Sequence, residues 1–301
     1  MESKTKIWIK AFRLRTLPLA LASIGMGSFL AAAEGKFNGA IFSLCALTTI
    51  FLQILSNLAN DYGDSVHGAD NKDRKGPIRT VQSGQISHGQ MKTSIFIFSG
   101  LSLISGLGLI YISVGLNLQV FLFFLGLGIM SIIAAITYTS GKIPYGYKGL
   151  GDISVLIFFG LVGVMGSYYL YAFTLPLSFF LPALSCGLFS TAVLNLNNIR
   201  DIESDKKAGK FSIPVRIGRK NAVIYHWALL LGGLSCALLF VVLNFQSYYQ
   251  LIFLGTLPLL LRNGKAVSHQ KDSLKLDPYL KQMALTTLLF AITFGLGMLI
   301  S

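Results

Sequence analysis

Nine apolar stretches, each near the length that a bilayer requires, constrain the fold of this chain more than any other feature. A helix needs about 20 apolar residues to cross a bilayer, and it satisfies its own backbone hydrogen bonds on the way. Hydrophobic residues make up 53% of the chain and charged residues 12%, a balance that excludes a soluble domain. We therefore expect an all-α, polytopic membrane bundle of nine transmembrane helices, forming a single domain over residues 1–301. The expected spans are 16–33, 39–60, 94–114, 118–138, 152–172, 175–198, 221–243, 247–261 and 282–300.

The lysines and arginines gather on alternate loops between these spans. All but one of the 25 fall in the N-terminal segment or after the second, fourth, sixth and eighth spans, and Lys36 is the exception. Because cytoplasmic loops carry the excess of Lys and Arg, we expect the N-terminus in the cytoplasm, the C-terminus outside and an odd number of spans. The formal charge of +13 then needs no nucleic-acid partner. We expect a multi-pass protein of the cell (inner) membrane.

The second span runs into a polar stretch whose first acids share one spacing. Asn57, Asp61 and Asp64 fall at i, i+4 and i+7, so a continuing helix places them on one face. Two carboxylates on one face repel each other unless a cation lies between them. A Mg²⁺ ion held by carboxylates and by the phosphate oxygens of a substrate meets that need. A solvated acidic loop is the alternative interpretation of a single motif of this kind.

A second copy of the pattern favours a binding site over a solvated loop. Asn197, Asp201 and Asp205 fall at i, i+4 and i+8, again at the end of an apolar run. In both copies cations follow the acids, with a basic run leading to Arg79 in the first and Lys206 directly after the acids in the second. Acids suit a metal and cations suit a phosphate, so this order supplies partners for both.

Two further places carry candidate side chains. The fourth span ends at Tyr138, and Lys142 follows in the sequence YTSGK. An interfacial anchor is one interpretation, since aromatic residues gather at membrane interfaces. The other is that Lys142 reaches a phosphate while Tyr138 lines an aromatic pocket, and both stay open. At the end of the sixth span, Asn195, Asn197 and Asn198 indicate a site, because amides there are unfavourable unless they face a cavity or a partner.

Three stretches of this sequence resemble the UbiA-type intramembrane prenyltransferases. They are NLANDYGDSVHGADNKDRKGPIRTVQSGQIS, YTSGKIPYGYKGLGD and NLNNIRDIESDKKAGKFSIPVRIGR. Their sequences are most similar to those of the branch of that family that prenylates 1,4-dihydroxy-2-naphthoate in menaquinone biosynthesis. In the broader family a third aspartate follows the second by four residues, whereas here Asp70 lies six after Asp64. This spacing favours the naphthoate branch and leaves Asp70 open as either a metal-shell residue or a loop residue.

The resemblance implies two four-helix halves plus one further span, around a cavity open to the cytoplasm and to lipid. It implies an Mg²⁺-dependent transferase that joins a polyprenyl diphosphate to 1,4-dihydroxy-2-naphthoate and yields demethylmenaquinone, diphosphate and CO₂. Loops of about 61–92 and 199–220 are expected to act as cytoplasmic lids. The expected catalytic and metal-binding residues are Asp61, Asp64, Asp201 and Asp205. The expected substrate-binding residues are Asn57, Asn60, Arg79, Tyr138, Lys142, Asn197, Asn198 and Lys206.

Two other functions fit part of this evidence. A related enzyme acting on another aromatic acceptor, 4-hydroxybenzoate or homogentisate, would use the same motifs. A membrane transporter also places acids in a polytopic bundle, but near the midplane and commonly in broken helices. Here the acids lie at the ends of two spans, and the outer loops near 115–119, 172–174 and 244–247 are short and uncharged. This placement favours the enzyme.

Overall fold

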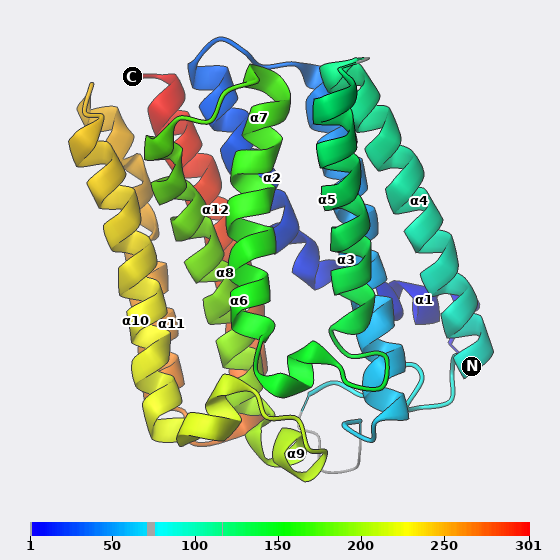
Figure 1. Ribbon diagram of the computed structural model, residues 1–301. Helices are drawn as coiled ribbons and strands as arrows, with labels where there is room; N and C mark the ends of the chain where they lie inside the picture. The colour runs from blue at the N-terminus through cyan, green and yellow to red at the C-terminus, as the bar shows by residue number, and fades with distance from the viewer. Residues whose placement is uncertain (1, 71–75, 116) are drawn as a thin grey trace.

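The structure is a computed structural model that describes residues 2–70, 76–115 and 117–301. Its regular secondary structure is helical, and no β-strand occurs in those ranges. Figure 1 shows the helices side by side as a bundle. Among the described residues, eight segments are long and apolar enough to cross a membrane. They are Lys4–Ala33 (α1, η1 and α2), Gly39–Val66 (α3), His88–Val114 (α4), Leu118–Thr137 (α5), Gly151–Ala172 (α6, η3 and α7), Leu177–Arg200 (η4 and α8), Ile213–Leu243 (α10) and Ser273–Leu299 (η6 and α12).

The composite segments divide at defined residues, and short helices lie between some of the spans. The parts are α1 Lys4–Phe12, η1 Leu14–Thr16, α2 Leu17–Ala33, α6 Gly151–Val155, η3 Leu156–Gly166, α7 Ser167–Ala172, η4 Leu177–Phe179, α8 Phe180–Arg200, η6 Ser273–Leu276 and α12 Asp277–Leu299. The short helices between spans are η2 (Tyr145–Lys148) and α9 (Ile202–Lys207).

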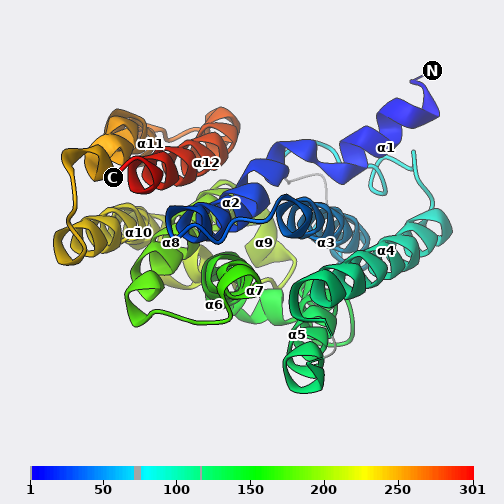
Figure 2. The same cartoon turned by 90° about the horizontal axis from the view of Figure 1, so that it is seen from above.

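The expected span at 247–261 is helical, but its helix is less apolar than the eight segments above. η5 (Tyr248–Thr256) and α11 (Leu257–His269) follow each other directly and lie beside α12 and α10 (Figure 2). Arg262 and Lys265 fall inside α11, which is why this segment does not count among the eight apolar ones. The helix stands where the eighth of the nine spans was expected, but its apolar part is short, so nine is an approximate count.

The helices form two groups around a central space, with α12 between them. One group holds α2, α3, α4 and α5, in which α3 packs along α4 and both contact α5. The other holds the α6–η3–α7 segment, α8, α10 and the η5–α11 segment, with α8 packed along α10. α12 packs along α2 and also contacts α8 and η5 (Figure 2). This arrangement confirms the expected fold class of two four-helix halves plus one.

The packing between these helices uses large aromatic side chains fitted to small ones. Phe189, Phe240, Phe253, Phe290 and Phe294 are fully buried where α8, α10, η5 and α12 meet. Lipid offers no hydrophobic drive between helices, so close fit of this kind holds a membrane bundle together.

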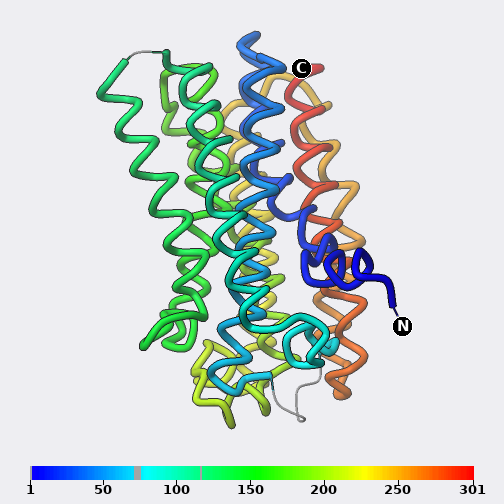
Figure 3. Tube along the Cα trace, turned by 90° about the vertical axis from the view of Figure 1, so that its right-hand side faces the viewer, coloured from blue at the N-terminus to red at the C-terminus, as the bar shows by residue number. Residues whose placement is uncertain are grey.

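The N-terminal helix α1 is separate from the span that follows it. Arg13 adopts a left-handed backbone conformation, with φ of 49°, which turns the chain between α1 and η1. α1 therefore projects away from the bundle axis (Figures 2 and 3). Ala11 packs with Ile54 and Leu58 of α3 and with Val81 of the next loop, forming a small second core. This placement agrees with the sequence of α1, KTKIWIKAF, in which lysines alternate with apolar residues.

Both motif-bearing helices extend toward the same end of the bundle. α3 continues to Val66 instead of ending at 60, and α8 ends at Arg200, directly before α9. We call this end, at the bottom of Figure 1, the carboxylate end. The C-terminus lies at the opposite end and the N-terminus lies toward the carboxylate end (Figures 1 and 3), as an odd number of crossings requires.

The fifth span contains a π-helical stretch over η3, between α6 and α7. π-helical turns are rare and occur frequently at functional sites. η3 packs against α2 and α8, so its wider turns face the central space. Ser23 of α2 donates a hydrogen bond to the backbone oxygen of Phe159 within it, at 2.5 Å.

Candidate active site

The first acid motif lies on the last two turns of α3. Because the helix continues through it, Asn57, Asp61 and Asp64 share a face as predicted, and all three side chains are buried. Gly63 lies directly against the chain that follows α5, since a Cβ there would meet the backbone of Thr139. The absence of a side chain at Gly63 therefore lets the end of α3 approach the segment after the fourth span.

Arg79 clamps the second carboxylate of this motif. Its guanidinium lies 2.7 Å from Asp64 and 3.1 Å from Asp70. Burial lowers the pKa of Arg79, but the surrounding carboxylates, Asp64 first, more than offset this and raise it. Tyr147 donates its hydroxyl proton to the other oxygen of Asp64 at 2.8 Å. Asp70, whose role the sequence left open, is thus a partner of Arg79.

Asp61 is held differently. The Thr80 hydroxyl donates to its Oδ2 at 2.7 Å, while its Oδ1 is buried and has no hydrogen-bond partner among the described residues. A buried carboxylate oxygen without a partner is unfavourable unless a cation meets it. Asp61 therefore offers an open ligand position.

The second motif begins with a carboxylate that an arginine clamps. Arg200 is buried, and its Nε and Nη2 donate to the two oxygens of Asp201 at 2.9 and 2.6 Å. The same guanidinium donates to the Asn197 side-chain oxygen at 2.8 Å. Two parallel hydrogen bonds from a guanidinium fix a carboxylate in orientation as well as in position.

Asp277, the first residue of α12, ties this arginine to the N-terminal segment. One of its oxygens accepts from Arg200 at 2.6 Å, and the other accepts from Arg15 at 2.9 Å. The ion-paired set therefore joins η1, the end of α8 and the start of α12. Because Arg15 also lines the central cavity, this set connects the cavity wall to the second motif.

The second carboxylate of this motif keeps an open oxygen. Asp205 lies on α9, where Lys210 approaches its Oδ1 at 3.5 Å and its Oδ2 is buried without a partner among the described residues. Burial raises the pKa of Asp205 to about 6, reinforced by Asp201 and Asp64 and opposed by Lys210. The side-chain oxygen of Asn198 is also buried without a partner in the described part of the chain. The buried oxygens of Asp205 and Asn198 are each suited to a cation.

The two motifs converge, and a tyrosine and a lysine lie between them. Lys210 approaches Asp205 and places its Nζ 5.8 Å from the centre of the Tyr147 ring, while Tyr147 bonds Asp64. Burial lowers the pKa of Lys210, but the carboxylates of Asp205 and Asp64 together raise it. Asp201 likewise contributes to raising the pKa of Arg79. Groups far apart in the sequence thus share one electrostatic field at the carboxylate end.

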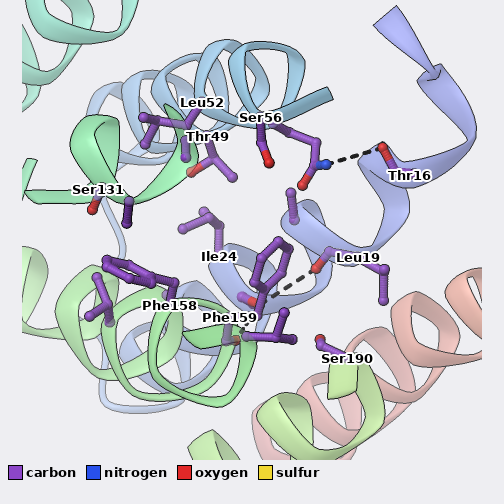
Figure 4. A pocket seen from close by; sticks show the side chains of 18 of the residues that line it. Thr16, Leu19, Ile24, Thr49, Leu52, Ser56, Ser131, Phe158, Phe159 and Ser190 are labelled. Carbon is purple, nitrogen blue, oxygen red and sulfur yellow. Dashed lines mark hydrogen bonds between the residues drawn. The ribbon is translucent and has the colours of Figure 1, made fainter. Parts of the chain in front are cut away.

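A cavity of about 420 Å³ lies on the membrane side of the motifs. Figure 4 shows its apolar walls, with Leu19 and Ile24 of α2, Leu52 of α3, and Phe158 and Phe159 of η3. Its polar lining includes four predicted substrate-binding residues: Asn57, Asn60, Tyr138 and Asn197. The four aspartates are not in the lining. The cavity therefore joins an apolar chamber to a polar boundary directly before the acids.

Several predicted residues lie elsewhere or have other partners. Lys142 and Lys206 are exposed and do not line the cavity. Asn57 donates its amide to the Phe12 backbone oxygen and to the Thr16 hydroxyl, both at 2.9 Å. It therefore fixes the N-terminal segment to α3, while its side chain also faces the cavity.

Four residues at the site were not among the predicted ones: Thr80, Tyr147, Arg200 and Lys210. Each had a signal in the sequence. Thr80 and Tyr147 lie in the polar stretches that follow spans two and four, and Arg200 directly precedes Asp201. Lys210 follows Gly209, whose φ of 72° ends α9 and turns the chain back under Asp205. The sequence carries the residues, but the choice among neighbouring cations depends on turns that position them.

The residues present fit a divalent metal that also needs a ligand from outside the protein. No group of three or more His, Cys, Asp or Glu side chains able to hold a metal occurs within residues 2–70, 76–115 and 117–301. Mg²⁺ is commonly held by one or two carboxylates, with substrate phosphates and water completing its shell. The open oxygens of Asp61 and Asp205 offer such partial sites, one in each motif.

Comparison with known proteins gives a consistent result. The model of the UbiA prenyltransferase family matches residues 20–286. A 1,4-dihydroxy-2-naphthoate octaprenyltransferase of Escherichia coli (strain K12) is 47% identical, covering 99% of this chain and 97% of that protein. One of Mycobacterium leprae (strain TN) is 33% identical, covering 95% of this chain and 93% of that protein.

Solved structures share the fold at low identity. A UbiA homolog from Aeropyrum pernix K1 superimposes with a TM-score of 0.67 at 17% identity, covering 96% of this chain and 98% of that one. A UbiA homolog from Archaeoglobus fulgidus bound to DMAPP and Mg²⁺ has a TM-score of 0.61 at 17% identity, covering 96% of this chain and 99% of that one. At this identity the likeness establishes the fold.

Proposed function

Because this chain belongs to the UbiA prenyltransferase family, we propose that it transfers a polyprenyl group from polyprenyl diphosphate to 1,4-dihydroxy-2-naphthoate. The transfer itself is redox-neutral, so its products are the quinol form of demethylmenaquinone, diphosphate and CO₂. Full-length relatives at 47% identity carry the name of this activity, which supports the naphthoate acceptor over 4-hydroxybenzoate or homogentisate. The observation that carries the proposal is the convergence of two acid motifs beside an apolar cavity.

The carboxylates bind the metal that the diphosphate requires. Asp61 and Asp64 would hold one Mg²⁺, and Asp201 and Asp205 a second. The open oxygens of Asp61 and Asp205 would be the direct ligands, and Asn198 and Asn197 would orient the second set. When bound, the metal ions stabilise the charge that develops on the diphosphate as its C–O bond breaks. The open oxygens of Asp61 and Asp205 support these assignments, and the arginine clamps on Asp64 and Asp201 keep the other two carboxylates in place.

Lys210 and Arg79 supply positive charge around the diphosphate oxygens. Both are buried at the convergence of the motifs, and each is already charged because the surrounding acids raise its pKa. Lys142 and Lys206 are exposed, and in this proposal they meet the diphosphate as it arrives from the cytoplasm. The segments expected as lids, about 61–92 and 199–220, are largely helical where they are described, since they include the end of α3, the start of α4, α9 and the start of α10. Residues 71–75 lie outside the described residues. In this proposal, the connections at 76–87 and 208–212 cover the bound group.

In this proposal, the apolar cavity holds the prenyl group while it is transferred. Its walls exclude water from the allylic cation, and the faces of Tyr138 and Phe158 can stabilise positive charge. The ring of the acceptor attacks at its carboxyl-bearing carbon. A C–C bond forms to the prenyl group, the carboxyl group leaves as CO₂ and the ring regains its aromaticity. Asn57, Asn60 and Asn197 line the polar boundary, where they can orient the two substrates.

The membrane arrangement follows from the substrates. A polyprenyl tail is insoluble in water, whereas the diphosphate and the aromatic acid are anions. We place the carboxylate end and the N-terminus in the cytoplasm and the C-terminus outside, in the inner membrane of the cell, because Lys and Arg gather at that end. The proposed partners are the two substrates and the lipid bilayer.

The direct test is turnover by the purified chain in lipid nanodiscs. With Mg²⁺, a polyprenyl diphosphate and 1,4-dihydroxy-2-naphthoate, we expect the prenylated product, diphosphate and CO₂ in equal amounts. EDTA should stop the reaction and added Mg²⁺ should restore it. A preference for 4-hydroxybenzoate or homogentisate in a competition assay would reassign the acceptor. No product with any aromatic acid would contradict the enzyme.

A further inference from the structure

The groove between α11 and the start of α12 plays no part in the proposed reaction. It has a volume of about 560 Å³ and is lined by Pro258, Leu261, Arg262, Lys265, Ala266 and Tyr279. None of these residues lines the central cavity. The groove lies on the outer side of the bundle, where α11 and α12 stand at the edge (Figure 2). In a membrane, this surface faces lipid.

The cations of the groove lie within the length of a membrane helix. Arg262 and Lys265 are one turn apart on α11 and therefore share a face. Arg262 is seven residues before the end of α11 at His269, which corresponds to about 10 Å along a helix. Both side chains are exposed, and neither has an ion pair in the described part of the chain. Exposed cations at such a depth are unfavourable unless an anion meets them.

The acids near this end of α12 have other partners. Asp277 accepts from Arg15 and Arg200, and Asp272 caps the backbone N–H of Leu274. The rest of the groove is apolar or aromatic, with Pro258 and Leu261 toward the bilayer side of the cations along α11. Tyr279 adds an amphipathic ring of the kind that gathers at headgroup depth. Two cations above an apolar floor complement a phosphate attached to acyl chains.

We propose that this groove binds the headgroup of an anionic phospholipid, with Arg262 and Lys265 at the phosphate and an acyl chain along Pro258 and Leu261. Basic pockets between membrane helices bind anionic headgroups by this chemistry. The site gives a role to the two exposed cations inside α11, the helix at the eighth expected span. It is independent of the proposed reaction, because it needs neither substrate nor metal.

Native mass spectrometry of the full-length protein tests this site directly. The protein is released from detergent micelles containing equal amounts of phosphatidylglycerol and phosphatidylcholine. We expect the wild type to retain phosphatidylglycerol preferentially, and the Arg262→Gln/Lys265→Gln double variant to retain at least about fivefold less. The single variant Lys265→Gln should show an intermediate loss and guards against a folding defect in the double variant.

The matched control is the Lys271→Gln/Lys275→Gln double variant, which removes two exposed cations from the segment that joins α11 to α12. It should retain phosphatidylglycerol like the wild type. Equal retention of the two lipids by the wild type, or an equal loss in the control, would overturn the site. So would loss of the bound phosphatidylglycerol on addition of farnesyl diphosphate, since the groove would then bind the prenyl donor. Native mass spectrometry reads lipid retention and does not depend on turnover. Failure of the lipid site is therefore distinguishable from failure of the proposed enzyme activity.

Discussion

In each acid motif, an arginine holds one carboxylate and the other carboxylate keeps an open oxygen. The order of these two carboxylates along the chain is opposite in the two motifs. In the first, Asp61 keeps a buried oxygen without a partner in the described structure, and Asp64 is clamped by Arg79. In the second, the clamped acid comes first, with Arg200 on Asp201, and Asp205 keeps the open oxygen. Each motif therefore has one carboxylate fixed by an arginine and one available to a cation.

This division has a physical reason. Two buried carboxylates side by side repel each other, and each needs compensation for the water it has lost. An arginine compensates one of them permanently and holds it in orientation. The other remains uncompensated until a metal arrives, so binding the metal relieves an unfavourable state. The reversed order shows that spacing along the helix does not decide which acid is clamped. The position of the nearest arginine decides it.

The largest expected effect separates the open acids from the clamped ones. Asp61→Asn and Asp205→Asn remove a direct metal ligand, so we expect turnover to fall by more than about 100-fold. Asp64→Asn and Asp201→Asn weaken groups already held by an arginine, so we expect losses of about 10- to 100-fold, as for residues that support a metal ligand. Turnover at saturating Mg²⁺ measures the ranking, and the electron paramagnetic resonance of bound Mn²⁺ measures metal affinity without turnover.

All four variants keep the side-chain shape, so thermal unfolding in the same detergent controls for misfolding. If Asp64→Asn loses as much Mn²⁺ affinity as Asp61→Asn, the first motif does not divide its acids. If the second motif alone shows the ranking, the comparison between the motifs fails while the enzyme assignment stands.

The second expected effect concerns the lysines that follow Asp205. Lys210 is buried between the two motifs, whereas Lys206, four residues earlier, is exposed. A hydrogen bond or contact with a charged group contributes about 1.5–3 kcal/mol, so Lys210→Gln should reduce turnover about tenfold or more. Lys206→Gln should change it less than about fivefold, because exposed charge pairs contribute little. Initial rates at several concentrations of the prenyl donor measure both.

Lys206→Gln is the matched control for Lys210→Gln, since both remove one charge from the same loop. Equal losses in the two variants would mean that the net charge of the loop matters and the burial of Lys210 does not. A change confined to kcat in Lys210→Gln, with KM for the donor unchanged, would place this lysine away from the diphosphate in the ground state.

The sequence was sufficient for the fold and for the shared helix face of Asn57, Asp61 and Asp64, and the reason is local. The catalytic role of the acids stays a prediction. Apolar length follows from the thickness of a bilayer, and the spacing of Asn57, Asp61 and Asp64 follows from the turn of a helix. Neither depends on what lies across the bundle. The eighth expected span is the exception, because Arg262 and Lys265 lie within its helix and its apolar stretch is therefore short.

The cations were harder to assign because their partners come from distant segments. Arg79 was expected at the diphosphate, and it is placed between Asp64 and Asp70 by the loop after α3. Lys206 was chosen for following Asp205 directly, but the turn at Gly209 is what brings Lys210 inward. A glycine after a short basic helix is a recognisable helix end, so this turn was within reach of the sequence. The partner of Tyr147, which lies on another helix, was not.

The smallest expected effect tests how firmly Arg200 holds Asp201. Asp277 shares Arg200 with Asp201, and its side chain is 29% exposed, so its contribution is limited by solvent. Asp277→Asn removes one of the two charges that balance Arg200, so the guanidinium should bind Asp201 more strongly and compete better with a metal. We expect the Mg²⁺ concentration for half-maximal activity, and the Mn²⁺ dissociation constant, to rise by about two- to fivefold, with KM for the acceptor unchanged.

Asp277→Glu should restore both values. Asp272→Asn, an exposed acid five residues earlier that caps Leu274, is the matched control and should leave metal affinity unchanged. A fall in the Mn²⁺ dissociation constant of Asp277→Asn would show that Asp277 itself strengthens the hold of Arg200 on Asp201. The clamped acid of the second motif would then be set by three groups acting together, unlike its counterpart in the first.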